Sequence, residues 1–525
     1  MIEIRGKQIK TNRVLEYLYL TSLKHNDKTA LQIENNGSMI KYTFNDLRQR
    51  SVDISSFLIR NGIEKGDRIA IFSENRPEWA ITLFGAMSAG AVTVPVDCKL
   101  SREELKFIIN SSKSKVLFVS GNLIPEVLAV YKELKTVNLI VCLDDNMTES
   151  VISFDDIRWS KGNRRGRMNQ VSSDDTALIV YTSGTTGVAK GVEITYNNLI
   201  FEVTELTKII HFSEKNHLVS ILPLNHTFEI TAGLLGPLFS GASISYTKSI
   251  RLTNLASLMK KVKCTDMICV PLILKMFHDG IFREVQNIGK IKQKLFFIML
   301  EISKFLFRYN IRIGRLFFKD IRNKFGGHLN SLMCGGAPLD PQVELNLNAL
   351  GIQIFQGYGL TETSPVISIN TDQHHKFGSV GKPVPGVKVK ILKTSETHSS
   401  EGEILVNGPN VMKGYFREPE KTSEVIRNEW FYTGDIGYID KDGYLFISGR
   451  LKNLIVLGAG KKVFPEEVEQ VMRKSIYIKE ICVYGAVAQT GSRKGYEVVN
   501  AVIVPSIENI PPELSNDNDK IRALI

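Results

Sequence analysis

Several features that would place this chain in a membrane or outside the cell are missing from its sequence. None of its 525 residues starts an apolar run of 18 or more, so we expect no transmembrane helix. The segment from Met1 to Lys7 lacks the apolar stretch of a secretory signal. The six cysteines lie far apart, without a CxxC pair or a metal-ligand spacing, which favours a reducing compartment. We therefore expect a cytoplasmic protein.

The bulk composition admits several classes of partner. An apolar content of 43% is that of an ordinary globular protein, and 525 residues predict more than one folding unit. The formal net charge is +11, which is compatible with nucleic acid, anionic lipid or a polyanionic substrate. The position of the charge along the chain has to decide among them.

Strands and helices alternate through the first part of the sequence. Short apolar runs predict strands at 68–73, 92–96 and 116–119, and apolar residues at helical spacing predict helices at 42–59 and 79–91. This alternation is typical of a parallel sheet with helices on both faces. The sequence therefore predicts an α/β fold whose large domain contains doubly covered sheets.

The pattern of predicted secondary structure changes after Pro383. Short strands and glycine turns fill 383–448, which indicates a small β-rich module, and Pro465 opens an amphipathic helix. We expect a large N-terminal domain over 1–450 that includes this module, followed by a small α+β C-terminal domain over 451–525.

A loop rich in glycine and hydroxyl groups follows the predicted strand 177–181. Glycines allow the main chain to approach phosphate oxygens, and a lysine adds a mobile positive charge. The loop is not a Walker A motif, because Ala189 rather than glycine precedes Lys190. The residues expected to bind phosphate are Thr182, Ser183, Gly184, Thr185, Thr186, Gly187 and Lys190.

This loop resembles the signature of the adenylate-forming, or AMP-binding, superfamily, which includes acyl-CoA synthetases, luciferases and peptide-synthetase adenylation domains. Ala189 replaces the usual proline. Four further segments follow in the order of the family: 335–339, 356–363, 432–437 and 449–453. The resemblance implies a ligase that uses ATP and Mg²⁺ to join an organic acid to AMP.

The resemblance also implies individual roles. The adenine contacts would come from Gly335, Gly336, Ala337, Pro338, Gln356, Gly357, Tyr358, Gly359 and Thr361. Thr182 and Glu362 would be the Mg²⁺ ligands, since magnesium prefers hard oxygen donors. Asp435 would bind the ribose diol, and Arg450 would reach ribose or phosphate. Without the resemblance, Asp435 would be an Asx-turn, Arg450 a surface ion pair and Glu362 a helix N-terminal charge.

Attack of a carboxylate on the α-phosphate brings two anions together, so catalysis requires charge neutralisation and alignment. The expected catalytic residues are Lys190, Thr182, Glu362, His226 and Arg450. His226 matches a family position beside the incoming carboxylate, although a single histidine can also be structural. Lys452 matches the hinge about which the small domain of these enzymes rotates.

The segment 281–325 carries most of the net charge. It holds eleven basic and three acidic residues with many aliphatic and aromatic ones between them, and we expect it to form two helices. A basic amphipathic segment favours an anionic bilayer surface, here the inner membrane face. The alternative is a packed helical hairpin with a solvated face, and nucleic acid is excluded by the many apolar residues.

An insertion at this place is similar to bacterial long-chain fatty acyl-CoA synthetases. The expected substrate is therefore a long-chain fatty acid, with CoA as the acceptor. Only 73 residues follow Lys452, and no Gly-Lys motif of the kind that carries the second lysine of the family follows Glu469. We thus expect a partial C-terminal domain, either in a fragment or in a chain that has lost adenylation power. The alternatives are an acyl-adenylate ligase that loads a carrier protein and an impaired binder of acyl groups or nucleotides.

Overall fold

The structure is a computed structural model that divides into two compact units. The first unit comprises Met1–Phe377, Val384–Val387 and Gly408–Glu424, and the second comprises Gly378–Pro383, Lys388–Asn407 and Val425–Ile525. The structure describes every residue except 1, 5–6, 10–13, 36, 145–150, 158–170, 183–188, 308, 310, 394–400, 458–461, 474, 491–495, 512–513, 515–519 and 523–525. The domain boundary predicted after residue 450 falls inside the second unit and stays a prediction.

Sheet I of the first unit has eight strands in the order β21-β11-β10-β6-β5-β7-β8-β9. The strands from β10 to β9 run parallel, whereas β11 is antiparallel to both β10 and β21. Their bounds are β5 (Arg68–Phe72), β6 (Val92–Val96), β7 (Ser114–Val119), β8 (Leu139–Cys142), β9 (Ile152–Ser153), β10 (Thr176–Thr182), β11 (Lys190–Thr195) and β21 (Gly414–Tyr415).

Sheet II of the first unit contains the order β17-β16-β15-β14-β12-β13-β3-β4. The six strands from β16 to β3 are parallel, and β17 and β4 flank them as antiparallel strands. The bounds are β3 (Thr29–Asn35), β4 (Ser38–Thr43), β12 (His217–Ser220), β13 (Ser243–Tyr246), β14 (Asp266–Cys269), β15 (Ser331–Cys334), β16 (Gln353–Gly359) and β17 (Val366–Ile369). A short hairpin of β1 (Ile2–Ile4) and β2 (Lys7–Ile9) precedes both sheets.

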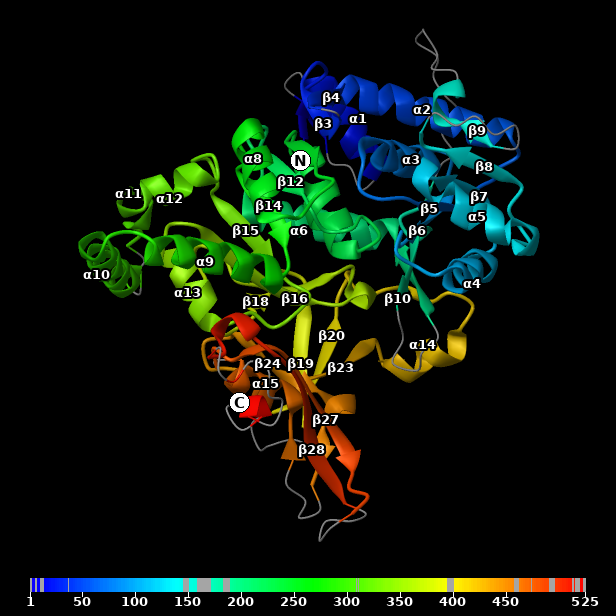
Figure 1. The fold of residues 1–525 in the computed structure, drawn as a ribbon. Coiled ribbons are helices and arrows are strands. Elements are labelled where there is room, and N and C mark those ends of the chain that lie inside the picture. The colour runs from blue at the N-terminus through cyan, green and yellow to red at the C-terminus, as the bar shows by residue number, and fades with distance from the viewer. Residues whose placement is uncertain are drawn as a thin grey trace. The chain divides into compact units, whose positions relative to one another are not determined.

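Helices pack on these sheets, as Figure 1 shows for α3 beside β5 and β6. Their bounds are α1 (Val14–Lys24), α2 (Phe44–Arg60), α3 (Pro77–Ser88), α4 (Arg102–Ser112), α5 (Ile124–Val130), α6 (Tyr196–Ile210), α7 (Gly236–Phe239), α8 (Leu252–Val262), α9 (Pro271–Gln286), α10 (Lys290–Phe307), α11 (Gly314–Phe317), α12 (Lys319–Lys324), α13 (Pro341–Ala349) and α14 (Pro419–Val425). A π-helix, η4, spans Glu229–Leu235.

The predicted α/β class is confirmed, and so are the strands predicted at 68–73, 92–96, 116–119 and 177–181 and the helix that begins near Tyr42. β5 and β6 are almost completely buried, as strands covered on both faces must be. The helix predicted at 79–91 is α3, which starts two residues earlier because Pro77 fits the first turn of a helix. It ends before Gly90, whose φ of +73° stops the helix.

The contact between α2 and α3 depends on a glycine. Thr43 caps α2 and forms a reciprocal capping box with Asp46. A Cβ added to Gly85 of α3 would lie 2.4 Å from the Cγ2 atom of Ile54 in α2. The two helices can therefore approach closely only because residue 85 has no side chain. Trp79 of α3 is completely buried.

The second unit is small and rich in strands. β19 (Lys388–Leu392), β20 (Gly402–Asn407), β23 (Trp430–Ile439), β22 (Ile426–Arg427) and β24 (Leu445–Arg450) form one antiparallel sheet. Further elements are β18 (Lys382–Pro383), β25 (Ile455–Val456), β26 (Lys462–Val463), α15 (Pro465–Met472), β27 (Ile478–Val487) and β28 (Glu497–Pro505). The predicted β-rich texture after Pro383 and the helix that starts at Pro465 are both confirmed.

The structure corrects one prediction about 281–325. This segment begins inside α9 and contains one long helix, α10, followed by two short ones. The second predicted helix is therefore split, since the backbone of Phe318 between α11 and α12 departs from helical geometry, with a ψ of 34°. Among the described residues, no helix combines the length and the apolar character that are required to cross a bilayer.

Candidate active site

The glycine-rich loop connects two neighbouring antiparallel strands of sheet I. Thr182 is the last residue of β10, Lys190 is the first of β11, and the two residues pair directly. The predicted phosphate ligands Ser183, Gly184, Thr185, Thr186 and Gly187 lie outside the described residues. The strand pairing brings the two ends of the loop together, so both predicted side chains at its ends lie at one site.

A tyrosine that the sequence reasoning missed connects Lys190 with Glu362. Tyr415 of β21 lies beside β11, where it pairs with Val192. The ammonium of Lys190 lies 4.9 Å from the centre of the Tyr415 ring, within the range of a cation–π contact. The Tyr415 hydroxyl donates a hydrogen bond of 3.0 Å to Oε1 of Glu362. Burial, followed by the nearby Glu362 carboxylate, raises the pKa of Tyr415, so the phenol keeps its proton and remains a donor.

Glu362 is fixed by its backbone as well as by its side chain. Its carbonyl accepts a 2.8 Å hydrogen bond from the amide of Met412, just ahead of β21. The half-buried carboxylate has more acceptor sites than the single bond from Tyr415 occupies. Magnesium commonly takes one or two carboxylates and completes its shell with water and phosphate oxygens. Glu362 and the Thr182 hydroxyl therefore fit such an ion, while the described residues contain no cluster of three His, Cys, Asp or Glu side chains.

The residues predicted to contact adenine lie at the carboxyl edge of sheet II. Cys334 ends β15 and pairs in parallel with Gln356 of β16, so the loop that starts at Gly335 lies next to Tyr358. The carboxyl edge of parallel strands is the usual place of a ligand site in α/β proteins. The structure thus brings together two of the predicted segments, Gly335–Pro338 and Gln356–Gly359.

Two features of β16 are consistent with a ligand site at these residues. A Cβ at Gly359 would lie 1.7 Å from the carbonyl oxygen of Pro365, so no larger residue fits there. Gln356 is buried, and its Oε1 atom has no hydrogen-bond partner among the described residues. A buried acceptor without a donor is costly, and an amino group of a ligand would satisfy it.

His226 reaches the same edge from β12. Its segment is held by Asn75, whose side chain donates to the Leu222 carbonyl at 2.6 Å and accepts from the Leu224 amide at 2.8 Å. His226 itself is exposed, and the protein atoms that partly shield its ring lower the pKa of the imidazole. It is therefore neutral near pH 7. Asn75 follows β5 in sheet I, and no sequence signal marked it.

Glu229 was a second residue that sequence reasoning missed. It opens the π-helix η4, an element that often occurs at functional sites. Its Oε1 atom accepts a 2.6 Å hydrogen bond from Ser220, whereas its Oε2 atom has no partner among the described residues. Complete burial raises the pKa of Glu229 to about 8, so the carboxyl is mostly protonated at neutral pH.

In the second unit, Asp435 and Arg450 form a pair. They face each other on β23 and β24, and the Arg450 Nε atom donates to the Asp435 Oδ1 atom at 2.7 Å. The side chain of Asp435 is 5% exposed and that of Arg450 is 47% exposed. Lys452, the predicted hinge residue, is exposed two positions later. The ribose and hinge roles of these residues remain predictions.

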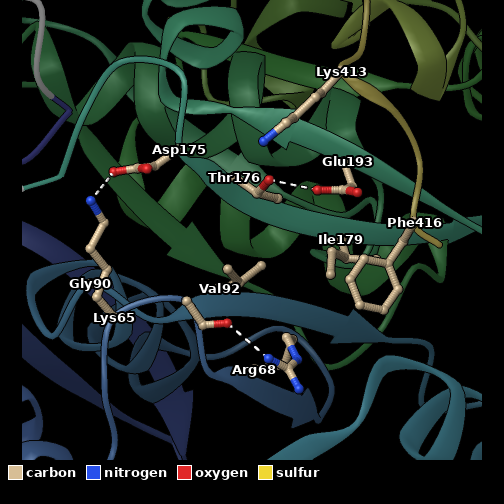
Figure 2. A pocket seen from close by; sticks show the side chains of 11 residues that line it. Lys65, Arg68, Gly90, Val92, Asp175, Thr176, Ile179, Glu193, Lys413 and Phe416 are labelled. Carbon is tan, nitrogen blue, oxygen red and sulfur yellow. Dashed lines mark hydrogen bonds and ion pairs between the residues drawn. The ribbon is translucent and has the colours of Figure 1, made fainter.

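A cavity of about 230 Å³ lies elsewhere, at the amino ends of β5, β6 and β10 (Figure 2). Two interactions lie within its lining: Lys65 pairs with Asp175 at 2.7 Å, and Thr176 donates to Glu193 at 2.7 Å. Because Thr182 ends β10 at the opposite edge of sheet I, this cavity is separate from the predicted phosphate loop.

The fold is that of the adenylate-forming enzymes. The structure matches an anthranilate CoA ligase solved with anthranoyl-AMP at a TM-score of 0.78, with 22% identity, over 97% of this chain and 90% of that one. The sequence profile of the AMP-binding enzymes matches residues 21–416. The chain belongs to this family of AMP-binding enzymes.

Two relatives describe the branch of the family that this chain is similar to. A long-chain-fatty-acid–CoA ligase of Mycobacterium bovis is 31% identical over 452 residues, which cover 82% of this chain and 72% of that protein. A chloroplastic long-chain-fatty-acid–[acyl-carrier-protein] ligase of Arabidopsis thaliana is 28% identical over 574 aligned positions, covering 95% and 77%. Both relatives act on long-chain fatty acids by name, but their acceptors differ.

Proposed function

We propose that this enzyme activates a long-chain fatty acid with ATP and transfers the acyl group to CoA. The fatty carboxylate attacks the α-phosphorus, the bond to the bridging oxygen of the β-phosphate breaks, and pyrophosphate leaves. The thiol of CoA then loses its proton and attacks the acyl carbon, which releases AMP. The single observation that carries this proposal is the contact of Lys190 and Glu362 with Tyr415 at the end of the phosphate-loop hairpin.

The arrangement around Tyr415 supports binding of a polyphosphate. Among the described residues, no carboxylate forms an ion pair with Lys190, so its charge is available to phosphate oxygens. Thr182 and Glu362 would hold Mg²⁺, which would neutralise further negative charge on the triphosphate. Groups positioned before the reaction stabilise developing charge without reorganisation, and this is usually a large part of catalysis.

The adenine base would bind at the carboxyl edge of sheet II. Tyr358 offers a flat face for adenine, and the unsatisfied Oε1 atom of Gln356 is suited to an amino group. Asp435 would accept hydrogen bonds from the ribose hydroxyls, and Arg450 would contact ribose or phosphate. His226, neutral at pH 7, would lie beside the fatty carboxylate without adding a charge to it.

The choice of a long-chain fatty acid as the substrate and the choice of CoA as the acceptor rest on different support. Both relatives named above act on long-chain fatty acids, and 281–325 resembles the insertion of bacterial long-chain enzymes. CoA is the acceptor in the name of the more similar relative, and an acyl carrier protein is the acceptor in the other. Loading of a carrier protein is therefore the second candidate function.

The proposal includes a cytoplasmic location and peripheral contact of 281–325 with the inner membrane face. The six free cysteines support a reducing compartment. The basic and apolar character of the segment supports the membrane contact.

A paired assay tests the function. The purified chain is incubated with ATP, Mg²⁺ and palmitate, and then with CoA or an acyl carrier protein, while AMP and acylated product are measured. We expect palmitoyl-CoA and stoichiometric AMP. Product with the carrier protein alone would favour the second candidate, and AMP formation that requires benzoate or anthranilate instead of palmitate would overturn the choice of acid.

A further inference from the structure

The turn that carries His226 is closed by side chains at both of its ends. The turn spans 221–228, between Ser220, the last residue of β12, and Glu229, the first residue of the π-helix η4. The Ser220 hydroxyl donates a 2.6 Å hydrogen bond to the Oε1 atom of Glu229, and both side chains are buried. This contact therefore joins the two ends of the turn directly.

Asn75 connects the same contact to the interior of the turn. Its side-chain amide donates to the Ser220 hydroxyl at 3.0 Å and to the Leu222 carbonyl at 2.6 Å. Its side-chain oxygen accepts from the Leu224 amide at 2.8 Å. The Ser220 hydroxyl has a single proton, which it donates to Glu229, so it acts as an acceptor toward Asn75. The hydrogen bonds thus run in one direction, from Asn75 through Ser220 to Glu229.

The backbone of His226 is attached to both sides of this network. Its amide donates to the Pro223 carbonyl at 3.1 Å, within the part of the turn that Asn75 holds. Its carbonyl accepts from the Ile230 amide at 3.1 Å, one residue beyond Glu229 in η4. No hydrogen bond to another described residue fixes the imidazole. The position of the ring therefore depends on the backbone of the turn.

A glycine makes room for the Glu229 carboxyl. Gly233 lies four residues later in η4, and a Cβ added there would lie 2.5 Å from the Cδ atom of Glu229. The second oxygen of the carboxyl, Oε2, has no hydrogen-bond partner among the described residues. A buried carboxyl with an unsatisfied oxygen costs stability, so packing alone does not account for an acid at this position.

We propose that Glu229 is a positioning residue for His226. Through Ser220 and Asn75 it holds the turn in the conformation that presents the imidazole to the carboxylate of the acid. The role of His226 in this inference rests on the proposed function, whereas the hydrogen bonds that hold the turn do not. Groups that are held in place before a reaction need no further ordering during it. Without the contact between its two ends, the turn gains conformational freedom, and the imidazole loses its fixed position.

Steady-state kinetics of the full chain separates the acid from the nucleotide. Glu229→Met removes the acceptor at similar volume, and Ser220→Ala removes the donor. We expect each to lower kcat/KM for palmitate about tenfold, while KM for ATP stays within about twofold of the wild type. Glu229→Gln keeps an oxygen that accepts from Ser220, so it should retain about half of the wild-type kcat/KM or more. Equal losses in Glu229→Gln and Glu229→Met would overturn the proposal.

A matched control and a double-mutant cycle test the route of the effect. Ser303 is also buried and donates a 2.7 Å hydrogen bond to the Ala349 carbonyl, between α10 and α13, so Ser303→Ala should have wild-type kinetics. If Glu229 acts through His226, Glu229→Met should cause less than about a twofold further loss in a His226→Ala enzyme. Independent, additive losses from the two substitutions would contradict the proposed route.

Hydrogen–deuterium exchange, followed by mass spectrometry, measures the turn without reference to activity. Glu229→Met and Ser220→Ala should speed exchange of the backbone amides in 221–228 about tenfold, and Glu229→Gln should not. Unchanged exchange in the turn, faster exchange throughout the chain, or faster exchange with unchanged kinetics would each overturn the proposal. If the wild-type chain does not turn over palmitate, the proposed function fails, and exchange in 221–228 still decides whether Glu229 holds the turn.

Discussion

Three carboxylates of the two units have hydrogen-bond partners of different kinds. In the first unit, Glu362 accepts from the Tyr415 hydroxyl and Glu229 accepts from the Ser220 hydroxyl, so the partners are neutral. In the second unit, Asp435 accepts from the guanidinium of Arg450. All three carboxylates are buried or half-buried, yet only one of them faces a cation in these contacts.

In these contacts Lys190 and Glu362 are not paired with an opposite charge, whereas Asp435 and Arg450 are paired with each other. The Lys190 ammonium contacts the face of the Tyr415 ring, and Glu362 accepts a hydrogen bond from the hydroxyl of the same tyrosine. Asp435 and Arg450 neutralise each other, and a ligand that uses either side chain has to compete with their bond. We therefore expect Lys190 and Glu362 to serve mainly in ligand binding, and the bond between Asp435 and Arg450 to contribute to stability as well.

Loss of the free cation should have the largest effect on turnover. Lys190→Ala should lower kcat/KM about 100-fold or more, because it removes a charge that stabilises the transition state. The melting temperature should stay unchanged, since the lysine loses only a contact with a ring. The measurement is steady-state kinetics with a thermal melt, and Lys190→Arg serves as the charge-preserving control. A fully active Lys190→Ala enzyme would show that the charge of Lys190 is not needed for turnover, and the contrast drawn between Lys190 and the paired Arg450 would be wrong.

Loss of the paired cation should affect stability as well as turnover. In Arg450→Ala, the Asp435 carboxylate, whose side chain is 5% exposed in the wild type, loses its guanidinium partner, which should cost about 1–3 kcal/mol of unfolding free energy. We expect kcat/KM to fall about tenfold. Urea unfolding of Arg450→Ala and Arg450→Lys checks the prediction. Equal stability of Arg450→Ala and the wild type would show that the pair does not stabilise this unit.

The two contacts of Tyr415 can be separated. Tyr415→Phe keeps the ring beneath Lys190 and removes the hydrogen bond to Glu362, so we expect about a tenfold loss of kcat and about 1 kcal/mol of stability. Tyr415→Leu removes both contacts and should lower kcat further. The Mg²⁺ dependence of both variants is measured beside the wild type. Identical kinetics of Tyr415→Phe and the wild type would mean that Tyr415 does not position Glu362.

The free energy of unfolding should depend on pH through the buried carboxyl of Glu229, which accepts a hydrogen bond from a neutral hydroxyl. The pKa of Glu229 is about 8 in the folded chain and 4.5 ordinarily, so the folded state holds this proton more tightly between the two values. The stability that this proton contributes is complete below pH 4.5 and is lost progressively as the pH rises from 4.5 through 8, by at most about 1.4 kcal/mol per pH unit.

The isosteric variant Glu229→Gln lacks this titration. We expect the stability of the wild type to fall relative to the variant between pH 5 and pH 8, as measured by urea midpoints at three pH values. A constant difference across that range would contradict the raised pKa.

The sequence predicted the elements that depend on local patterns. Continuous apolar runs identified β5 and β6, and a proline marked the start of α15 at Pro465. The spacing of the motifs also led to the family, which the profile match over 21–416 confirms. These signals are local, so a single sequence is sufficient to read them.

The residues that the sequence did not predict act through pairing between distant segments. Tyr415 meets Lys190 only because β21 adds to β11, and Asn75 reaches the His226 segment from another sheet. The segment 281–325 gave an ambiguous pattern because α10 is apolar on both its buried and its exposed faces. When apolar residues occur on both sides of a helix, the sequence does not show which side packs against the core. For this reason the sequence left both interpretations of 281–325 open.

The most direct test of the account is detection of the intermediate. The wild-type chain, Lys190→Ala and Tyr415→Phe are each incubated with ATP, Mg²⁺ and palmitate in the absence of CoA, and palmitoyl-adenylate is quantified by mass spectrometry. The account predicts palmitoyl-adenylate and an equal amount of pyrophosphate in the wild type, less of both in Tyr415→Phe, and almost none in Lys190→Ala. A wild-type chain that binds ATP but forms no adenylate, or equal amounts in all three proteins, would contradict it.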